Sequence, residues 1–301
     1  MVTGKGGTGK TTFAAALAVL AAAQGRRTLL CEIDSQRPSM TPFFDTVPRF
    51  APQTVRPNLD LCNIEWEPAL ESFLEGLVPS RRIVKLILSN QIVSRFLDVT
   101  PGSQELVELS TLGRYIDQYD TVIVDMPASG HAFSLLDITR SAMGLFRSGP
   151  IRRRATELKS LLTASTTRVV FVALPEEMVV NETLETIQRM RKYELIGGEP
   201  TVYLNRATLP TLTEHERSVM TQLGEAQLSS VQEEFIRAGR WEDVLEQGTA
   251  QSRERLQSGI GLDPVLVSPA NPGRSGREVV EDVAVSLGRE VGLTRRDLAW
   301  T

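Results

Sequence analysis

The residues best suited to chemistry lie at the start of the chain, in a pattern that reads G-x-x-x-x-G-K-[ST]. Glycines let the backbone wrap closely round a polyphosphate, and the N–H groups that open the next helix then face the anion. In such a loop Lys10 reaches the outer phosphates, and the Thr11 hydroxyl coordinates Mg²⁺. The predicted phosphate-binding residues are Gly4, Gly6, Gly7, Thr8, Gly9, Lys10, Thr11 and Thr12.

Three polar side chains stand where later predicted strands end: Asp34, Asp125 and Asn205. The carboxyl ends of parallel strands line the ligand crevice of an open α/β sheet. We expect Asp125 to hold Mg²⁺ or its water, and Asp34 to orient or deprotonate an attacking water. Asn205 is expected to hydrogen-bond the edge of a base. A single such aspartate is often only a turn residue, but two after a full phosphate loop favour catalysis.

The N-terminal residues could instead form a secretory leader, with Lys5 and Lys10 as its charged region and 13–23 as its apolar core. Four glycines at these spacings favour the phosphate loop. Only three residues precede Gly4, whereas strands usually run about five to six residues. We therefore expect the natural first strand to begin upstream of Met1.

Behind these residues the chain alternates between predicted strands and helices. Apolar runs predict strands at 28–33, 59–64, 121–125, 168–174, 201–204 and 265–267. This order predicts one α/β domain over 1–301, an open, mostly parallel sheet with helices on both faces. Residues 36–116 are too helical for that alternation. We therefore predict an inserted helical subdomain at about 66–116. A second helical segment is expected at about 213–257, and the proline-rich stretch 38–58 as an irregular connection.

Local signals place several helix ends. Gly25 is a C-cap signal for a helix over 10–24, and Asn181 is a plausible N-cap for a helix over 182–193. Thr213-x-x-Glu216 and Ser275-x-x-Glu278 are capping boxes that predict further helix starts.

Composition excludes several classes. The 301 residues are 41% hydrophobic and 23% charged with a net charge of −4, so no basic footprint for nucleic acid is present. The cluster 152–154 is expected to be a solvated face. Cys31 and Cys62 show no metal-ligand spacing, and we expect both to be small core residues. No apolar run could span a bilayer, which favours a cytoplasmic protein without stable membrane insertion.

Lys5 is the most informative residue, because an ordinary phosphate loop tolerates any residue there. A lysine at this place is the "deviant" signature of a class that dimerises around nucleotide. The chain resembles the ArsA family, which includes arsenite-pump ATPases and ATPases that target tail-anchored membrane proteins. Besides the loop, the segment 125–131, Asp-Met-Pro-Ala-Ser-Gly-His, is close to the family's second switch, Asp-Thr-Ala-Pro-Thr-Gly-His. Further motifs fall in family order at 58–65, 101–105, 175–183 and 205–206.

The resemblance implies an ATPase that uses ATP and Mg²⁺ and works as a homodimer or with a paralogue. Lys5 would reach the partner's phosphates, Asp34 would position water, and Asp125 would be the acid on the Mg²⁺ side. Asn205 would bind adenine, with Pro269 in the adenine-side loop 269–274. No Asn-Lys-x-Asp guanine signature is present, which also favours ATP. His131 is expected to be structural within the switch rather than a proton shuttle.

Departures from the family pattern limit the resemblance. Residues 206–261 contain no cysteine, so the zinc clasp of the tail-anchor branch is not expected. Two separated, buried cysteines cannot supply an arsenite-binding cluster. The first switch, 34–36, has Asp-Ser-Gln where the family has Asp-Pro-Ala, so its motion can differ.

The client stays open, with a membrane protein as one candidate. The apolar helices at 69–97 could line a client groove or simply pack internally, and internal packing is favoured. A ParA- or MinD-like positioning ATPase shares the loop and Lys5. The mixed-charge C-terminal helix and the absence of a basic face speak against membrane and DNA versions of that alternative. A nucleotide-gated scaffold without turnover is the other alternative, and the presence of both Asp34 and Asp125 speaks against it.

Overall fold

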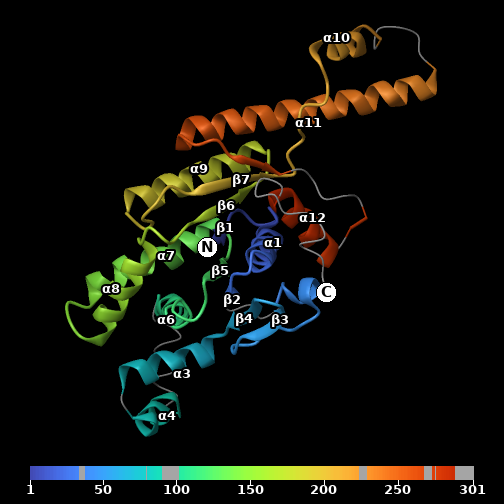
Figure 1. Cartoon of the computed structure of the whole chain (residues 1–301). Helices are drawn as coiled ribbons and strands as arrows, with labels where there is room; N and C mark the ends of the chain where they lie inside the picture. The colour runs from blue at the N-terminus through green and yellow to red at the C-terminus, as the bar shows by residue number, and fades with distance from the viewer. Residues whose placement is uncertain are drawn as a thin grey trace.

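The computed structural model describes residues 1–33, 38–78, 80–89, 102–223, 229–267, 273–274 and 276–288. Within these residues an eight-stranded sheet carries helices on both faces (Figure 1), which confirms the predicted α/β class. The strand order across the sheet is β3-β4-β2-β5-β1-β6-β7-β8. The strands are β1 Val2–Thr3, β2 Thr28–Ile33, β3 Gln53–Arg56, β4 Leu59–Ile64, β5 Thr121–Asp125, β6 Val170–Ala173, β7 Thr201–Asn205 and β8 Val265–Val267.

The short strand β1 lies in the interior of the sheet and pairs in parallel with both β5 and β6. The paired strands from β4 to β8 all run parallel. Their side chains are covered on both faces, which explains why these runs are apolar almost throughout. The phosphate loop that follows β1 is therefore held at the carboxyl edge of the sheet.

The edge beyond β4 corrects the expectation of an irregular connection at 38–58. A short helix, α2 (Thr41–Phe44), and strand β3 lie in this stretch, and β3 pairs antiparallel with β4. The hairpin turns through Pro57 and Asn58, and Asn58 adopts the left-handed backbone conformation at φ 61°. Prolines are compatible with an edge strand. The prolines of this stretch therefore led to a predicted irregular connection where an edge strand is present.

One face of the sheet is covered by α1 (Lys10–Ala23) and α12 (Arg277–Gly288). Alanines 14, 15, 16 and 18 of α1 are completely buried, and Val280 and Ala284 of α12 belong to the same core. Small side chains let a helix lie close to its neighbours. Gly25, just past the end of α1, has φ 80° and supports the predicted helix end.

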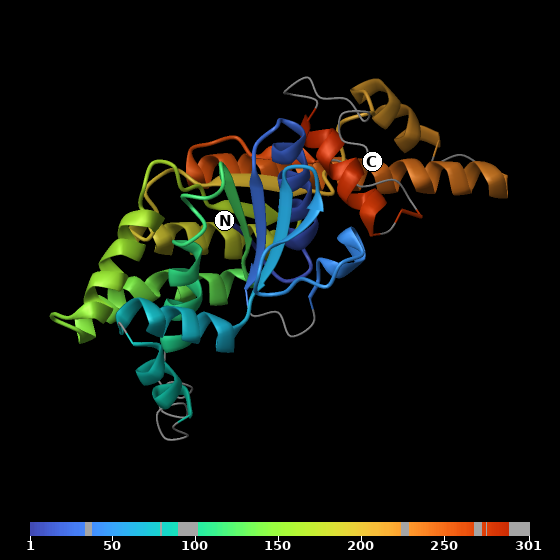
Figure 2. The ribbon, with the colours of Figure 1, turned by 60° about the horizontal axis from the view of Figure 1, so that its bottom comes forward.

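The opposite face holds the larger core and most of the remaining helices (Figure 2). These helices are α3 Trp66–Leu77, α4 Arg81–Ser89, α6 Ser103–Leu112, α7 Ser129–Leu145, α8 Pro150–Leu162 and α9 Glu177–Lys192. Of these, α3, α4 and α6 lie between β4 and β5 in the chain. The insertion therefore follows β4, because residues 53–64 of the stretch 36–116 belong to the main sheet.

Helix α9 corrects a predicted helix start. It begins at Glu177 after the N-cap residue Glu176, so Asn181 lies inside the helix and not at its end. The earlier start places Val179 and Val180 in the helix, and both are buried in the core. Burial of two apolar side chains outweighs the local capping preference of an asparagine.

Beyond the helices that cover the sheet, the chain forms a helical hairpin of α10 (Glu214–Leu223) and α11 (Ser230–Ile260). One helical segment was expected there. Figure 1 shows α11 running well past the sheet, with α10 beside its far half. The predicted capping box is confirmed: Glu216 N–H donates to the Thr213 hydroxyl at 3.2 Å, and Thr213 N–H donates to the Glu216 carboxylate at 2.7 Å. None of the helices that the structure describes combines the length and apolar character that a bilayer span requires.

Candidate functional site

The backbone of the loop 4–9 needs glycine at defined places. A Cβ on Gly4, at φ 149°, would lie 2.2 Å from the carbonyl oxygen of Val172 in β6. A Cβ on Gly9, at φ 94°, would lie 2.9 Å from the amide nitrogen of Asn205. Side chains at these positions would push the loop off the sheet or off Asn205. Gly6 and Gly7 face open space, and Gly7 also has a positive φ of 85°.

The loop closes on itself and leaves the start of α1 open. Thr8 donates its hydroxyl to the carbonyl of Lys5 at 2.9 Å, and the Lys10 ammonium donates to the same carbonyl at 3.2 Å. Among the described residues no side chain caps α1, and its first turn contains no acidic residue. Its first N–H groups and the positive end of its dipole are therefore available to an anion.

Asp125 and Thr11 meet beside that helix start. The Thr11 hydroxyl hydrogen-bonds the Asp125 carboxylate. The Asp125 Oδ1 atom is buried and has no hydrogen-bond partner within the described part of the chain. Burial, and secondarily the charge of Glu32, raise the pKa of Asp125 to about 7, against the opposing effects of Thr11 and Lys10. Within the described residues, Lys10 and Thr11 therefore do not fully offset the burial of this carboxyl.

Glu32 is a neighbour that the sequence interpretation missed. It lies in β2 in register with Asp125 of β5, and its side chain is only 2% exposed. Burial raises the pKa of Glu32, although hydrogen bonds from Ser39 and Met40 oppose this. A glutamate inside the otherwise apolar run 28–33 was the available signal.

The residues present fit a divalent cation. Mg²⁺ takes oxygen ligands and uses one or two protein carboxylates together with substrate phosphates. The Thr11 hydroxyl and the Asp125 carboxylate lie together, and one buried oxygen of Asp125 lacks a partner among the described residues. A cation beside this oxygen would compensate for its burial.

Lys5 makes a contact within its own chain. Its ammonium lies 3.4 Å from Glu182 of α9, and the two side chains are 34% and 37% exposed. Glu182 also accepts a hydrogen bond from the hydroxyl of Ser129, which opens α7. Ser129 N–H in turn donates to the carbonyl of Gly4 at 3.0 Å. The contacts of Glu182 and Ser129 thus connect the phosphate loop with the segment 125–131.

The Lys10 ammonium is partly buried. Burial lowers the pKa of Lys10, and the carboxylates of Asp125 and Glu182 counteract this effect. A partly desolvated ammonium next to the open start of α1 is suited to bind phosphate oxygens.

Asn205 ends β7 on the other side of the loop. Its amide donates to the carbonyl of Thr8 at 2.9 Å, and its own carbonyl oxygen accepts from the N–H of Arg206. These contacts place Asn205 against the phosphate loop, so a nucleotide bound there lies within its vicinity.

The remaining predicted residues divide into two groups. Thr12 lies in the first turn of α1, and His131 is exposed in the first turn of α7. Asp34 and Pro269 lie outside the residues that the structure describes. Their predicted roles stay predictions.

The cysteines are buried, as predicted, but they are not separated. Cys31 of β2 and Cys62 of β4 face each other in register, and the Cys62 thiol donates to the Cys31 sulfur at 3.3 Å. Burial, together with the neighbouring thiol, raises the pKa of Cys31 well above its usual range. A buried protonated thiol is a poor metal ligand, so the predicted absence of arsenite binding remains the expectation for this pair.

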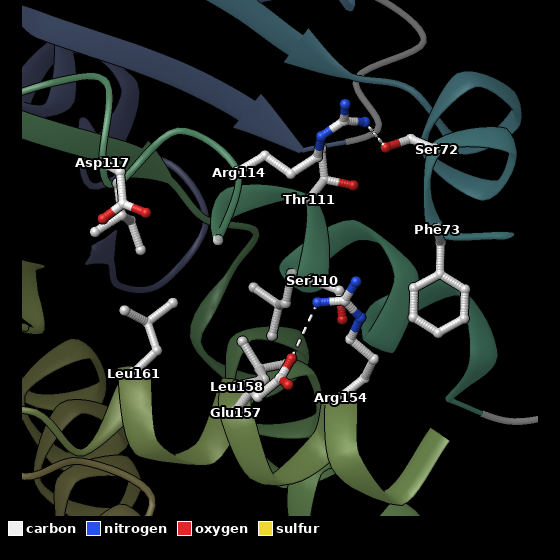
Figure 3. Close-up of a pocket in the computed structure, with 13 residues that line it drawn as sticks. Ser72, Phe73, Ser110, Thr111, Arg114, Asp117, Arg154, Glu157, Leu158 and Leu161 are labelled. Carbon is white, nitrogen blue, oxygen red and sulfur yellow. Dashed lines mark hydrogen bonds and ion pairs between the residues drawn. The ribbon is translucent and has the colours of Figure 1, made fainter. Parts of the chain in front are cut away.

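A cavity of about 320 Å³ lies apart from the phosphate loop, between α3, α6 and α8 (Figure 3). Arg114 donates to Ser72 at its rim, and Arg154 pairs with Glu157 at 3.0 Å. The predicted solvated face at 152–154 is confirmed for Arg153 and in part for Arg154, whose side chain is 37% exposed. Arg154 lines this cavity, and Arg152 donates to the carbonyl of Met143 at 2.6 Å.

Comparison with known proteins gives a consistent assignment. The model of a family described as anion-transporting ATPase matches residues 1–163. The ATPase BagA of Mycobacterium tuberculosis is 31% identical over 254 residues, which cover 79% of this chain and 73% of BagA. ATPase ASNA1 homolog 1 of Paramecium tetraurelia is 28% identical over 138 residues, 45% of this chain and 42% of its own. An arsenical pump-driving ATPase of Acidiphilium multivorum is 25% identical over 227 residues, 65% of this chain and 38% of its own.

Proposed function

This chain belongs to the family of anion-transporting ATPases, the ArsA family, and is an ATPase; we propose that it hydrolyses ATP as a nucleotide-bridged pair of copies. In this proposal each copy binds ATP at its own loop 4–12 and lends Lys5 to the ATP of the other. The nucleotide state then controls the handling of a client protein.

The proposal depends on the different surroundings of the Lys5 and Lys10 ammonium groups. Lys10 is partly buried beside the start of α1, where it can neutralise the phosphates of its own ATP. Lys5 is held at the rim by Glu182, through a contact that is about one-third exposed. An exposed ion pair contributes about 0–1 kcal/mol, so a partner's triphosphate can attract Lys5 away at little cost.

Within each site the residues divide the work of phosphoryl transfer, which depends on positioning and charge neutralisation. The N–H groups of the loop and α1 bind the phosphates, and Lys10 neutralises the outer ones. Thr11 and Asp125 would hold Mg²⁺, which when bound neutralises the phosphate oxygens. Asp34 orients the attacking water, and Asn205 binds adenine.

Transfer of Lys5 to the partner leaves Glu182 without its counter-ion. Glu182 keeps its contact with Ser129, and Ser129 contacts the carbonyl of Gly4. We propose that this change moves the segment 125–131 and through it the helical subdomain at about 66–116. Such a switch couples a local charge to a larger element.

Mixing two inactive variants tests the exchange of lysines. Lys5→Ala keeps its own loop but cannot help a partner, and Lys10→Ala can lend Lys5 but cannot bind ATP. In a mixed pair the site of the Lys5→Ala copy receives Lys5 from the Lys10→Ala copy. An equimolar mixture is therefore expected to regain turnover that neither variant shows alone.

Light scattering with a non-cleavable ATP analogue provides the matching measurement of size. The wild-type protein is expected to pair, and Lys10→Ala to stay monomeric. Full turnover by Lys5→Ala, or a wild-type protein that hydrolyses ATP while monomeric, contradicts the exchange. A wild-type protein that pairs only after addition of a paralogue would instead favour a mixed pair.

The client part of the proposal is supported by α4, where Ile83 and Leu86 are 48% and 69% exposed while Val84 is buried. If this helix takes part in client binding, hydrophobic-dye fluorescence should rise when ATP is bound. An unchanged signal in all nucleotide states would leave α4 as an ordinary surface helix.

A further inference from the structure

Two carboxylates are buried side by side where the sheet meets the start of α1. Glu32 of β2 and Asp125 of β5 are directly opposite in the parallel register. Residues two positions earlier in each strand, Leu30 and Ile123, belong to the core under α1, so both acidic side chains point to that face.

The two oxygens of Glu32 have different surroundings. Its Oε1 accepts the N–H of Ser39 at 2.8 Å and the Ser39 hydroxyl at 2.6 Å. Its Oε2 is buried and has no hydrogen-bond partner among the described residues. The Oδ1 atom of Asp125 is in the same situation.

A buried carboxylate oxygen without a partner is costly, and a second carboxylate beside it adds repulsion. The ammonium of Lys10 acts on Asp125, and the Thr11 hydroxyl donates to it. For Glu32 the donors known within the described residues, Ser39 and Met40, all lie in the segment that follows residues 34–37. A hydrated divalent cation would supply both unpartnered oxygens with positive charge and donors at once.

We propose that Glu32 is a second carboxylate of the Mg²⁺ site, which holds the ion or one of its waters together with Asp125. This inference rests on the proposed function and adds a residue to its cation site. Because Oε1 fixes Ser39, Glu32 also ties the bound cation to the chain just after Asp34. Glu32 is thus a positioning residue for the segment that orients the attacking water.

A purely structural Glu32 would serve only to fix Ser39. In that case a neutral glutamine, which keeps an oxygen acceptor for Ser39, would leave cation binding unchanged. The proposal expects the opposite, because glutamine removes the charge while it keeps the shape.

Mn²⁺ binding to the ADP-loaded protein, followed by electron paramagnetic resonance of free Mn²⁺, measures the site without turnover. Glu32→Gln is expected to weaken Mn²⁺ binding by about 10–100-fold, the usual effect of removing a supporting residue from a metal site. Glu32→Asp, which keeps the charge on a shorter side chain, should restore part of the affinity. Glu108→Gln is the matched control, since Glu108 is equally buried, at 3% exposure, but lies on α6.

Thermal unfolding gives a second measurement, in which a purely structural role and a cation-binding role of Glu32 predict different results. In EDTA, Glu32→Gln should be at least as stable as the wild type, because it removes the repulsion with Asp125. On addition of Mg²⁺ and ADP it should gain less stability than the wild type. An equal loss of stability with and without Mg²⁺ would overturn the proposal, as would unchanged Mn²⁺ affinity.

The outcomes separate this inference from the proposed function. If the wild-type protein binds Mn²⁺–ADP and Glu32→Gln binds it equally well, only the role of Glu32 fails. If the wild type binds no Mn²⁺–ADP, the proposed magnesium-dependent ATPase site fails as well. Should Glu32→Gln not fold, Glu32→Asp decides, since the proposal requires its Mn²⁺ affinity to fall measurably.

Discussion

Two parts of the molecule bury carboxylates in opposite ways. On α11, Glu246 is 4% exposed and accepts hydrogen bonds from the N–H and hydroxyl of Thr211, while Arg217 of α10 donates to its second oxygen at 2.6 Å. Although burial opposes it, these bonds hold the pKa of Glu246 below its usual range. At the sheet edge, Asp125 and Glu32 each keep one buried oxygen without a partner in the described part of the chain.

The difference separates a group that holds the fold together from groups arranged for a ligand. Glu246 is satisfied within the chain, so its burial stabilises the α10–α11 hairpin. Asp125 and Glu32 are not satisfied within the described residues, and a buried polar group without a partner calls for a ligand, an ion or water. Damage to the hairpin should therefore reduce stability and leave catalysis intact, and damage to the loop should do the reverse.

The largest effect is expected from Lys5→Ala. Loss of a cation delivered to the partner's phosphates should lower kcat by about 10³-fold or more. ADP affinity and urea stability should change little, because the Lys5–Glu182 pair is partly exposed. Lys192→Ala, at an exposed lysine on α9, is the control. If Lys5→Ala lost as much stability as activity, the distinction between catalytic and structural residues would not hold.

Arg217→Met tests the other side of the comparison. It leaves Glu246 buried with an unpaired oxygen, which should cost roughly 2 kcal/mol. Since α10 buries none of its own residues, the loss should show as faster amide exchange in α10, with ATP turnover unchanged. Arg255→Met on α11, where the pair with Glu177 is exposed, is the control. A fall in turnover would mean that the hairpin takes part in catalysis.

Asn205→Ala sharpens the comparison within the nucleotide end. The variant loses the 2.9 Å contact with the Thr8 carbonyl and the proposed contact with adenine. One hydrogen bond of this kind contributes about 1 kcal/mol, so the preference for ATP over GTP should fall about 5–10-fold in competition binding. An undiminished preference would place base recognition elsewhere.

The smallest expected effects come from the arginine cluster at 152–154. Arg152→Ala removes donors to the carbonyls of Met143 and Phe146 at the end of α7 and should cost about 1 kcal/mol in urea unfolding. Arg153→Ala should stay within about 0.5 kcal/mol of the wild type, because its pair with Glu157 is exposed. Equal losses would show that the cluster acts as one unit.

Local chemistry decided what could be predicted from the sequence. The phosphate loop, the capping box at Thr213 and the buried strands follow from neighbouring residues, and the structure has all three. The start of α9 and the strand β3 could not be predicted this way. Burial of Val179 and Val180 decided the first, and pairing with β4 decided the second.

The candidate site shows the same limit. Strand ends indicated Asp125 and Asn205, but only the strand order β4-β2-β5 places Glu32 opposite Asp125 and Cys31 opposite Cys62. The contact of Lys5 with Glu182 likewise depends on the packing of α9 against the loop. Spatial neighbours that are distant along the chain require the sheet register, which a single sequence does not contain.

The buried alanines of α1 limit how far this helix can move during the ATPase cycle. With four buried alanines between the larger Phe13 and Val19, this helix packs closely against the sheet and α12. Such close packing opposes movement of α1 when phosphate binds or leaves at its start. We therefore expect the movement that follows hydrolysis to occur in the segments beside the helix. Ala15→Leu should lower turnover, because the larger side chain would push α1, with Lys10 and Thr11 at its start, away from the sheet.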